Sequence, residues 1–469
     1  MRLPRGLIRG FVLPLAAGVA VWFSGVLAWT LKGPRHLKTL AVSENRLREF
    51  QSAADETRRL LETLLDSKSY HPPNVTDVNC TKFFLTADSE HQDGLDNYND
   101  HKINYDEDEG PGSDNNDTMT ERRPRNMREI LTVTENCTRY VLESGFLFAR
   151  VSEEELSFPL AFSILVHKDL DQVERLLRVL YRPHNVYCVH ADRKSDADFQ
   201  SGLRLIVSCL PNVFMVERSV DVRWAKMSVL EPELECMRRL LAHRAKWRYF
   251  INLTGQEFPL KTNKELVQIL TALRGANDVG ASREKRFHYR WRKSQPTPYI
   301  LTMSKGDVHM LASRGYVDYV INSRVAHEML AWLQDSFIPD ETFFSTMNHN
   351  PQLGVPGSYL GSLENRNKEP VRSFKIWIFQ NIHRCSGKFV RMVCIFGVGD
   401  LPLLVNADPY LIANKFSNHY QPLAYDCMEK WYFDKVQQEN LGLAKPLDLS
   451  LYENSDIVKH RYTGPILIW

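Results

Sequence analysis

The sequence predicts an α/β fold in which helices cover both faces of a mostly parallel sheet. Buried-strand runs recur at residues 160–166, 185–192, 212–217 and 249–255, and segments with apolar residues at helical spacing separate them. Strands that alternate with helices need crossover connections, which give parallel pairing and put helices on both faces. The chain has 469 residues and is 43% hydrophobic, enough for one large domain with additional segments.

The N-terminal region contains an uncharged apolar run at residues 10–31, after a basic stretch at residues 1–9. About 20 apolar residues span a bilayer, whereas a cleaved signal peptide has an apolar region of roughly 7–15 residues. We therefore expect a retained transmembrane signal-anchor, with residues 1–9 as a cytoplasmic tail. A cleaved signal peptide is the alternative.

Residues 32–127 are expected to form a stem before the folded domain. Apolar residues between Leu47 and Leu64 recur at helical spacing, which predicts a short amphipathic helix that would allow a homodimer. Residues 88–121 contain twelve acidic residues and one lysine, so we expect a disordered spacer there. An acidic calcium loop is the alternative, although the carboxylates lack the order of such a loop.

Sequons and cysteines indicate the compartment of the segments after the apolar run. Four sequons precede the folded core, where an acceptor must be exposed, and we expect glycosylation at Asn74, Asn79, Asn116 and Asn136. A fifth, Asn252, belongs to a strand run and is expected to be buried and unmodified. Eight cysteines fit disulfides in an oxidising compartment, with buried free thiols as the alternative. Everything after Lys32 is therefore expected in a lumen.

Charge and motifs narrow the class of ligand. The net charge is +2, and positive charge outside the acidic spacer is too diffuse for a nucleic-acid interface but suits an anionic small molecule. Neither a G-x-G-x-x-G after the first strand nor a G-x-x-x-x-G-K-[ST] is present, which argues against a dinucleotide fold and a P-loop NTPase.

The folded domain is expected to span residues 128–469. After the strand at 160–166, apolar residues repeat at helical spacing from Leu170 to Leu180, and a long helix is expected over 228–245. Open parallel sheets bind ligands at the carboxyl ends of their strands. The predicted strand ends place four residues at such a cleft: His167, Asp192, Thr254 and Gly255.

Several ordered motifs between Phe158 and Cys427 resemble one enzyme family. They include "FSILVHKDLDQVERLLRVLYRPHNVYCVHADRKS", "YFINLTGQEFPLKTN", "IPDETFF", "CSGKFVRMVCIFGVGDL" and "LIANKFS". This ordered set resembles the core 2 and I-branching β-1,6-N-acetylglucosaminyltransferases, which are type II Golgi membrane enzymes.

The resemblance implies a GT-A type glycosyltransferase fold with a Rossmann-like sheet. It also implies an inverting reaction that moves N-acetylglucosamine from UDP-N-acetylglucosamine to the 6-hydroxyl of galactose or N-acetylgalactosamine in O-glycans or poly-lactosamine. No metal and no other cofactor is expected. The expected partners are the UDP-sugar, a glycan acceptor on a glycoprotein or glycolipid and the Golgi membrane, with no nucleic acid.

The resemblance also assigns site residues. The family's catalytic base falls on Glu341, and its two diphosphate-binding cations fall on Arg391 and Lys415. The uracil and ribose of the donor are expected at Val166, His167 and Asp192. The acceptor is expected at Arg290, Trp291, Asp340 and Trp377.

The chemistry of the reaction fits these residue types. A sugar hydroxyl is too weak an acid to attack unaided, so a carboxylate must take its proton. Cations must meet the charge that develops on the leaving diphosphate, and fixed Arg and Lys side chains can replace a divalent ion.

Two carboxylate motifs carry a second interpretation. The adjacent Asp340 and Glu341 follow Pro339, as at a helix N-terminus, so Asp340 is expected to cap while Glu341 acts as the base. Asp169-Leu-Asp171 and Asp196-Ala-Asp198 lie at predicted helix starts, where acidic residues cap helices. A metal site is the alternative for these two pairs.

The family's disulfide pattern maps onto all eight cysteines. The pairs it implies are Cys80–Cys427, Cys137–Cys209, Cys188–Cys236 and Cys385–Cys394. Thr254 stands where the family has an additional cysteine that forms no disulfide.

Departures from the family pattern concentrate on the acceptor side. Phe287 stands where a lysine is expected, and Asp307 and His309 replace small and aromatic residues. The family has a tryptophan that stacks on the acceptor sugar, and Trp377 aligns with it only if the alignment is shifted by one residue. Two alternatives therefore stay open: transfer of another sugar, such as xylose, and a non-catalytic glycan-binding Golgi protein.

Overall fold

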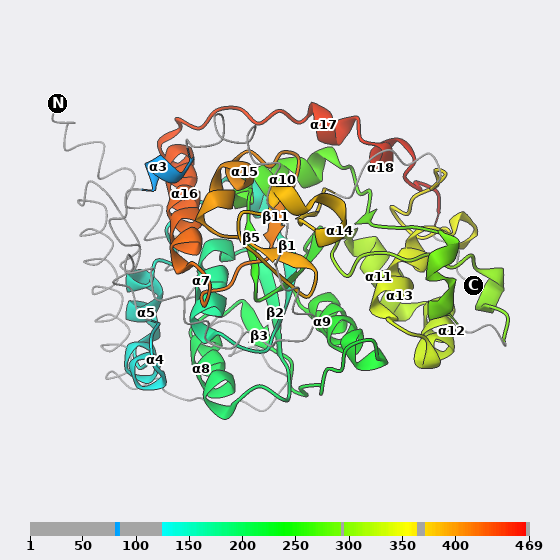
Figure 1. Cartoon of the computed structure of the whole chain (residues 1–469), viewed down its shortest axis with the longest axis horizontal. Helices are drawn as coiled ribbons and strands as arrows, with labels where there is room; N and C mark the ends of the chain where they lie inside the picture. Colours follow the sequence, from blue (N-terminus) through cyan, green and yellow to red (C-terminus); the bar gives the residue numbers. More distant parts are fainter. Residues whose placement is uncertain (1–79, 85–123, 292–294, 364–370, 466–469) are drawn as a thin grey trace, which may run out of the picture. The chain divides into compact units, whose positions relative to one another are not determined.

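The computed structural model describes residues 80–84, 124–291, 295–363 and 371–465 (Figure 1). The predicted cytoplasmic tail, the anchor at 10–31 and the acidic spacer at 88–121 lie outside these ranges, as do the sequons at Asn74, Asn79 and Asn116. Within the described ranges, no helix combines the length and the apolar character needed to cross a membrane.

The main sheet has six strands in the order β3-β2-β1-β4-β7-β6. Their bounds are β1 Leu160–Val166, β2 Val186–Ala191, β3 Val213–Met215, β4 Tyr249–Thr254, β6 Asp278–Val279 and β7 Met310–Ser313. β1 pairs in parallel with β2 and β4, and β2 pairs in parallel with β3, whereas β7 runs antiparallel to β4 and β6. The predicted mostly parallel sheet is confirmed. β3 is shorter than the predicted run at 212–217: Val216 still donates from its backbone to Val189 of β2, and the chain bends at Glu217.

Helices connect and cover the strands. Before and between the parallel strands lie α3 Thr81–Phe84, α4 Met127–Thr134, α5 Cys137–Glu143, α6 Glu153–Ser157, α7 Leu170–Leu180, α8 Ala197–Ser208 and α9 Glu231–Ala242. The later helices are α10 Asn263–Ala272, α11 Arg314–Asn322, α12 Arg324–Trp332, α13 Asp340–Asn348, α14 Ile378–Asn381, α15 Leu401–Val405, α16 Pro422–Leu441, α17 Ser450–Glu453 and α18 Asp456–Lys459.

The helix predicted over 228–245 is too long at both ends. A 3₁₀ turn at Met227–Val229 precedes α9, and His243 has an extended backbone that ends it. The predicted helix from Leu170 to Leu180 is confirmed as α7.

Both faces of the central strands are buried, because successive residues of a strand point to opposite sides. Leu160, Phe162 and Ile164 of β1 belong to a core that includes residues of α7, α8, α10 and α16. Ala161 of β1 belongs to a second core with residues of α9, α11, α12 and α13. The expected arrangement of helices on both faces is therefore present, and it leaves the strand ends open for a site.

The structure also contains a smaller sheet, whose β5 lies between β4 and β6 in the chain, and a hairpin that follows β7. The smaller sheet has the order β5-β11-β8, with β5 Glu257–Pro259, β11 Ile412–Asn414 and β8 Ser373–Phe374. The hairpin consists of β9 Lys388–Val390 and β10 Val393–Ile395.

Four disulfides link the described body. They join the pairs that the family resemblance implies: Cys80–Cys427, Cys137–Cys209, Cys188–Cys236 and Cys385–Cys394. No free cysteine remains, so the alternative of buried free thiols is wrong for this structure.

Of the two described sequons, one is exposed and one is buried. Asn136 is exposed and caps α5 by accepting a hydrogen bond from the backbone of Arg139. Asn252 lies in β4 and is buried, and its side-chain amide donates to Glu233 at 3.0 Å. The expectation that Asn252 is strand-borne and buried is confirmed.

Candidate active site

A pocket of about 300 Å³ opens at the carboxyl ends of β1, β2 and β4. Parallel sheets bind ligands at this edge. Five residues that the sequence placed at a cleft or at a donor site line this pocket: Val166, His167, Asp192, Thr254 and Gly255. The structure brings them together, while their contact with a nucleotide stays a prediction.

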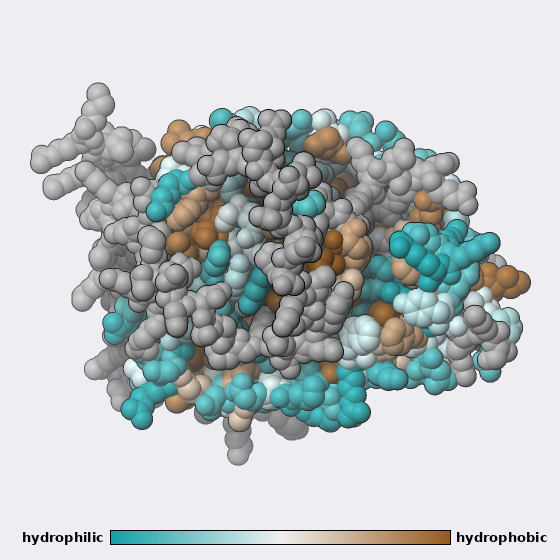
Figure 2. All heavy atoms as spheres, in the orientation of Figure 1, coloured by the Kyte–Doolittle hydropathy of each residue, from teal (hydrophilic) through white to brown (hydrophobic). Residues whose placement is uncertain are grey.

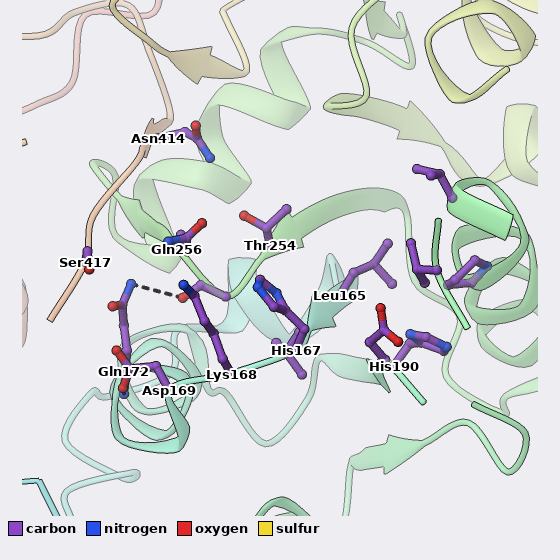
Figure 3. A pocket seen from close by; sticks show the side chains of 16 residues that line it. Leu165, His167, Lys168, Asp169, Gln172, His190, Thr254, Gln256, Asn414 and Ser417 are labelled. Carbon is purple, nitrogen blue, oxygen red and sulfur yellow. Dashed lines mark hydrogen bonds between the residues drawn. The ribbon is translucent and has the colours of Figure 1, made fainter. Parts of the chain in front are cut away.

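The pocket also contains residues that the sequence did not single out. They include Lys168, Gln172, His190, Gln256, Asn414 and Ser417 (Figure 3). Lys168 and Gln256 directly follow two of the predicted cleft residues, so the strand ends could have indicated them. Gln172 gave no such indication, because it lies inside a helix.

Gln172 holds three segments of the chain together at the pocket. Its Nε2 donates to the carbonyl oxygen of Gly255 at 3.1 Å (Figure 3). The same Nε2 donates to the carbonyl oxygen of Phe416 at 3.2 Å, and Oε1 accepts from the backbone of Asn418 at 3.0 Å. The start of α7 therefore fixes the turn after β4 and the segment after β11, which bring their residues to the pocket wall.

Two residues at the end of β2 fix the opposite wall. His190 is buried, which lowers its pKa to about 4, and its Nε2 accepts from the backbone of Val220 at 2.9 Å. The carboxylate of Asp192 lies 2.9 Å from Nζ of Lys194, which also contacts Asp221 at 3.0 Å. These contacts hold the segment after β3 beside the pocket.

Glu341 lies in the first turn of α13 and faces two cations. Its Oε2 accepts from Nη1 of Arg290 at 2.6 Å and lies 3.6 Å from Nζ of Lys305. The side chain of Arg290 is 8% exposed and that of Glu341 is 24% exposed. Burial opposes the charge of Arg290, but the hydrogen bond from its guanidinium to Glu341 outweighs this effect and raises its pKa. A partly exposed carboxylate next to a fixed guanidinium can take part in proton transfer and in sugar binding.

The neighbours of Glu341 include two other predicted acceptor residues. Trp291 donates from Nε1 to the hydroxyl of Thr342 at 3.2 Å. Asp340 is buried, and this burial, together with the nearby charge of Glu341, raises its pKa to about 7. The structure thus gathers Arg290, Trp291, Asp340 and Glu341 at one place.

The prediction that Asp340 caps the helix is wrong. Pro339 occupies the N-cap position of α13, and no side chain forms a cap hydrogen bond there. Asp340 is the first helical residue, and its Oδ1 has no hydrogen-bond partner among the described residues. The tertiary fold turns this carboxyl inward, which a sequence pattern of acidic residues at a helix start does not indicate.

A chain of polar contacts connects the pocket with the helix of Glu341. The backbone of Thr254 donates to Glu257 at 2.8 Å, and Glu257 lies 3.2 Å from Nε2 of His309. Nδ1 of His309 lies 3.2 Å from Asp307. Gly306, which directly precedes Asp307, donates from its backbone to the backbone carbonyl oxygen of Glu341 at 2.5 Å.

The charges in this chain are compensated within the protein. Burial disfavours ionisation of Glu257, but Arg372 and His309 outweigh it and lower the pKa of this carboxyl. Burial likewise disfavours ionisation of Asp307, but Lys375 and His309 hold its pKa well below the usual value. Lys375 donates to Asp307 at 2.7 Å. The two residues that replace small and aromatic side chains of the family are therefore part of a mostly buried ionic network.

Three other predicted site residues lie at the hairpin or after β11. Arg391 is exposed in the turn between β9 and β10, with φ 50°, and is not among the residues that line the pocket. Lys415 is half-buried and lies between the pocket-lining Asn414 and Ser417. Trp377 is half-buried, and its ring centroid lies 5.5 Å from that of Phe379. The structure thus brings Lys415 close to the pocket, while Arg391 and Trp377 belong to the hairpin region.

The first aspartate of each Asp-x-Asp pair caps a helix, as expected. Asp169 caps α7 by accepting from the backbone of Gln172 at 3.1 Å, and Asp196 caps α8 by accepting from Phe199 at 2.7 Å. Asp171 accepts from the side chain of Asn418 at 3.0 Å. The capping interpretation is confirmed.

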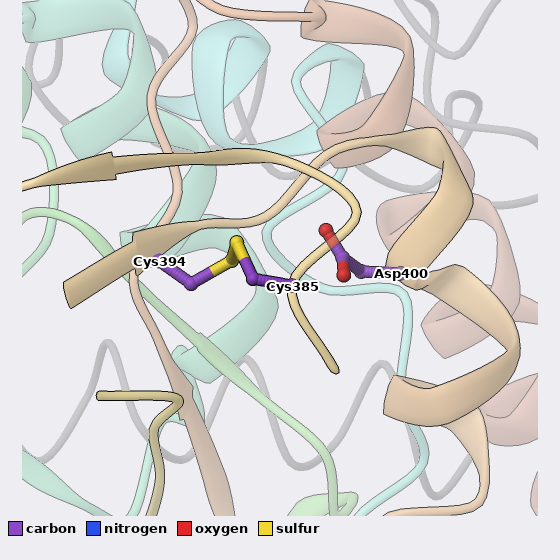
Figure 4. Close-up of side chains that lie close together, drawn as sticks. All are labelled: Cys385, Cys394 and Asp400. Carbon is purple, nitrogen blue, oxygen red and sulfur yellow. A yellow bond between two sulfur atoms is a disulfide. The ribbon is translucent and has the colours of Figure 1, made fainter. Parts of the chain in front are cut away.

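Among the described residues, one group of potential metal ligands lies close together: Cys385, Cys394 and Asp400 (Figure 4). The two cysteines form a disulfide with each other, so neither offers a thiolate. Asp400 accepts from the backbones of Ser386 at 2.7 Å and Gly397 at 2.8 Å. This group therefore stabilises the hairpin and does not fit a metal ion.

A family match covers α13 and all pocket-lining residues except Asn414 and Ser417. The model of the family described as Core-2/I-Branching enzyme matches residues 160–405. Human N-acetyllactosaminide beta-1,6-N-acetylglucosaminyl-transferase is 35% identical over 331 residues, which cover 66% of this chain and 81% of that protein. The zebrafish (Danio rerio) Beta-1,3-galactosyl-O-glycosyl-glycoprotein beta-1,6-N-acetylglucosaminyltransferase 4 is 34% identical over 338 residues, which cover 66% and 78% of the two chains. Human Beta-1,3-galactosyl-O-glycosyl-glycoprotein beta-1,6-N-acetylglucosaminyltransferase 3 is 32% identical over 343 residues, which cover 68% of this chain and 78% of that protein.

Proposed function

Because the chain belongs to the Core-2/I-Branching enzyme family of glycosyltransferases, we propose that it transfers N-acetylglucosamine from UDP-N-acetylglucosamine to a glycan. The acceptor is the 6-hydroxyl of galactose or N-acetylgalactosamine in an O-glycan or poly-lactosamine. The names of its relatives support the sugar and the linkage. The observation that carries the proposal is the carboxylate of Glu341, which pairs with Arg290, on a residue whose backbone carbonyl is linked by polar contacts to the pocket at the strand ends.

Glu341 acts as the base in this proposal. The acceptor oxygen attacks C1 of the donor sugar, its proton passes to Glu341, and the bond from C1 to the diphosphate breaks with the electron pair leaving on UDP. Attack on the face opposite UDP inverts C1. Arg290 and Lys305 approach Oε2, so we assign the proton transfer to Oε1. Arg290 and Trp291, with Asp340 beside them, would orient the acceptor.

Fixed cations would meet the leaving diphosphate without a divalent ion. The pocket wall contains Lys168, and Lys415 lies between two pocket-lining residues. Arg391 would reach the diphosphate from the hairpin that the Cys385–Cys394 disulfide closes. Arg offers a planar fork and Lys a point charge, and both interactions strengthen as charge develops on the leaving group.

We further propose that the chain is a Golgi membrane protein with its body in the lumen. The apolar run at residues 10–31 would be the anchor, with residues 1–9 in the cytosol and a stem that would allow a homodimer. Four disulfides support an oxidising compartment. Microscopy with a Golgi marker tests the compartment, and alkaline extraction of membranes tests the anchor. Recovery of the full-length chain in the soluble fraction after alkaline extraction would contradict the anchor.

The transferase proposal is tested with the full-length chain in detergent, UDP-N-acetylglucosamine and either a core 1 disaccharide or poly-lactosamine, with EDTA present. We expect EDTA-resistant transfer, and a loss of roughly 10²–10⁴-fold in kcat for Glu341→Gln with unchanged affinity for UDP. Glu328→Gln, a half-buried glutamate of α12 that pairs with Arg324 as Glu341 pairs with Arg290, is the matched control. Transfer that needs a metal, or full activity of Glu341→Gln, would contradict the mechanism. UDP binding without transfer to any galactoside would favour a non-catalytic glycan-binding role. Transfer from UDP-xylose would show that the donor sugar is xylose.

A further inference from the structure

Three aromatic side chains lie together on the surface: Trp224, Tyr289 and Phe337. They are 75%, 62% and 38% exposed, respectively. The ring centroids of Trp224 and Phe337 are 5.4 Å apart, and those of Tyr289 and Phe337 are 6.2 Å apart. Hydrophobic surface is visible at several separate places on the face shown in Figure 2, as is normal for folded proteins. A contiguous cluster of large exposed rings is different, because such patches mark interaction sites.

Backbone contacts tie this aromatic cluster to the proposed base. Phe337 donates from its backbone to the carbonyl oxygen of Arg290 at 2.9 Å and lies four residues before Glu341. Tyr289 directly precedes Arg290, whose guanidinium lies 5.9 Å from the centre of the Tyr289 ring. The cluster therefore adjoins the Arg290–Glu341 pair.

The same cluster also adjoins the wall of the pocket. Val222 lines the pocket, and Trp224 lies two residues after it. Hydrogen bonds to His190 and from Lys194 hold this segment in place. Trp224 contributes its ring from this wall, and Phe337 contributes its ring from the segment that leads to α13. The aromatic surface thus spans from the nucleotide side to the carboxylate side.

The backbone beside two of the rings is strained. Ala225 follows Trp224 with φ 63°, and Ile338 follows Phe337 with φ 54°. The left-handed region is uncommon for residues other than glycine and is a genuine outlier for a β-branched residue. Ile338 donates from its backbone to the carbonyl oxygen of Ala225 at 3.2 Å, so the two strained residues hold each other. Strain of this kind persists where surrounding structure imposes it, and it concentrates at functional sites.

We propose that Trp224, Tyr289 and Phe337 form a stacking surface for a sugar ring of the glycan acceptor. A pyranose has an apolar face of C–H groups and an edge of hydroxyls. Its apolar face suits exposed aromatic rings, while its hydroxyls suit the guanidinium and carboxylate next to them. This inference rests on the proposed function, and it places acceptor stacking on these rings and not on Trp377, whose backbone pairs with Val393 of the hairpin.

The test uses the full-length chain with Trp224→Ala, Trp224→Phe and Tyr289→Ala, and with Leu443→Ala as a control for loss of an exposed apolar side chain elsewhere. Initial rates give KM for the acceptor and for UDP-N-acetylglucosamine. Saturation-transfer difference NMR of N-acetyllactosamine, with UDP present, measures sugar contact without turnover. We expect KM for the acceptor to rise roughly tenfold in Trp224→Ala, to recover largely in Trp224→Phe, and to stay unchanged in Leu443→Ala.

The two measurements separate this inference from the proposed function. If the wild-type chain transfers no sugar but its NMR signal from the disaccharide disappears in Trp224→Ala, the proposed function fails and the stacking surface stands. An unchanged acceptor KM and an unchanged NMR signal in both alanine variants would overturn the stacking surface. A rise in KM for the donor alone would overturn it as well, because the rings would then belong to the nucleotide site.

Discussion

The guanidinium of Arg290 donates a 2.6 Å hydrogen bond to the carboxylate of Glu341, 51 residues later in the chain. Arg290 ends a 3₁₀ helix at Lys285–Arg290, and Glu341 is the second residue of α13. A second cation, Lys305, lies 3.6 Å from the same carboxylate oxygen. The orientation of the proposed base thus depends mainly on one nearly buried arginine.

Replacing this arginine tests that dependence. Arg290→Lys keeps the charge but loses the planar fork, so we expect kcat/KM for the acceptor to fall about ten- to hundredfold. Lys305→Met should have a smaller effect because its contact is longer. Steady-state kinetics with varied acceptor measure both variants. A larger loss for Lys305→Met than for Arg290→Lys would show that the arginine does not dominate.

Asp340 should make stability depend on pH. Burial raises its pKa from 3.8 to about 7, so the native state binds this proton more tightly than the unfolded state does. The stability contributed by the protonated carboxyl is fully present below pH 3.8 and is lost as pH rises through about 7. Asp340→Asn stays neutral, so its free energy of unfolding relative to wild type should increase from pH 5 to pH 8.

Urea unfolding at both pH values measures this difference. Because other buried carboxyls, such as Glu233 with a pKa of about 7, titrate equally in both proteins, only the difference between variant and wild type is informative. A difference that is equal at pH 5 and pH 8 would mean that Asp340 is ionised in the native state throughout this range.

The disulfide at the hairpin should matter for nucleotide binding. Cys385 and Cys394 enclose the turn that contains Arg391. We expect the Cys385→Ser/Cys394→Ser double variant to lose about 2–3 kcal/mol of stability and to bind UDP more weakly. Calorimetry of UDP binding measures this, with Arg391→Ala as the comparison. If the double variant loses stability but binds UDP normally, the hairpin has no role in holding the diphosphate.

Asp196 should contribute to stability and not to catalysis. It caps α8 through a 2.7 Å hydrogen bond to Phe199, and it is not among the residues that line the pocket. Asp196→Ala should lower the free energy of unfolding by about 1 kcal/mol, whereas Asp196→Ser should retain most of it. Thermal unfolding and transfer assays with and without Mn²⁺ check both points. Loss of a metal-stimulated activity in Asp196→Ala would revive the metal interpretation of this motif.

Much of the first half of the fold could be predicted from local patterns. β1 occupies the residues of the predicted run at 160–166, and α7 occupies those from Leu170 to Leu180. β1 is apolar along nearly its whole length, and the apolar residues of α7 recur at helical spacing although nearly all of its residues are buried, so both patterns are strong. The strand ends then located the pocket, because the geometry of a parallel sheet fixes where its open edge lies.

Contacts between distant segments could not be predicted in this way. No local pattern indicates that Gln172 holds two backbone segments, that Phe337 packs on Trp224, or that Asp340 turns inward. β6 and β7 are short and add to the sheet in antiparallel fashion, where apolar periodicity over two to four residues gives little information. These features depend on tertiary packing, and three of them lie in or beside the candidate site.

The disulfide between Cys80 and Cys427 closes a covalent loop, because it joins two residues that are 347 positions apart in the sequence. A protease that cuts once anywhere between residues 85 and 123 breaks the peptide chain but leaves both fragments joined through this bond. The body would then stay attached to the N-terminal segment until a reductant opens the disulfide, whereas a cut before Cys80 would release it at once. If residues 10–31 anchor the chain as proposed, its shedding from the membrane therefore requires either cleavage on the N-terminal side of Cys80 or a reducing step.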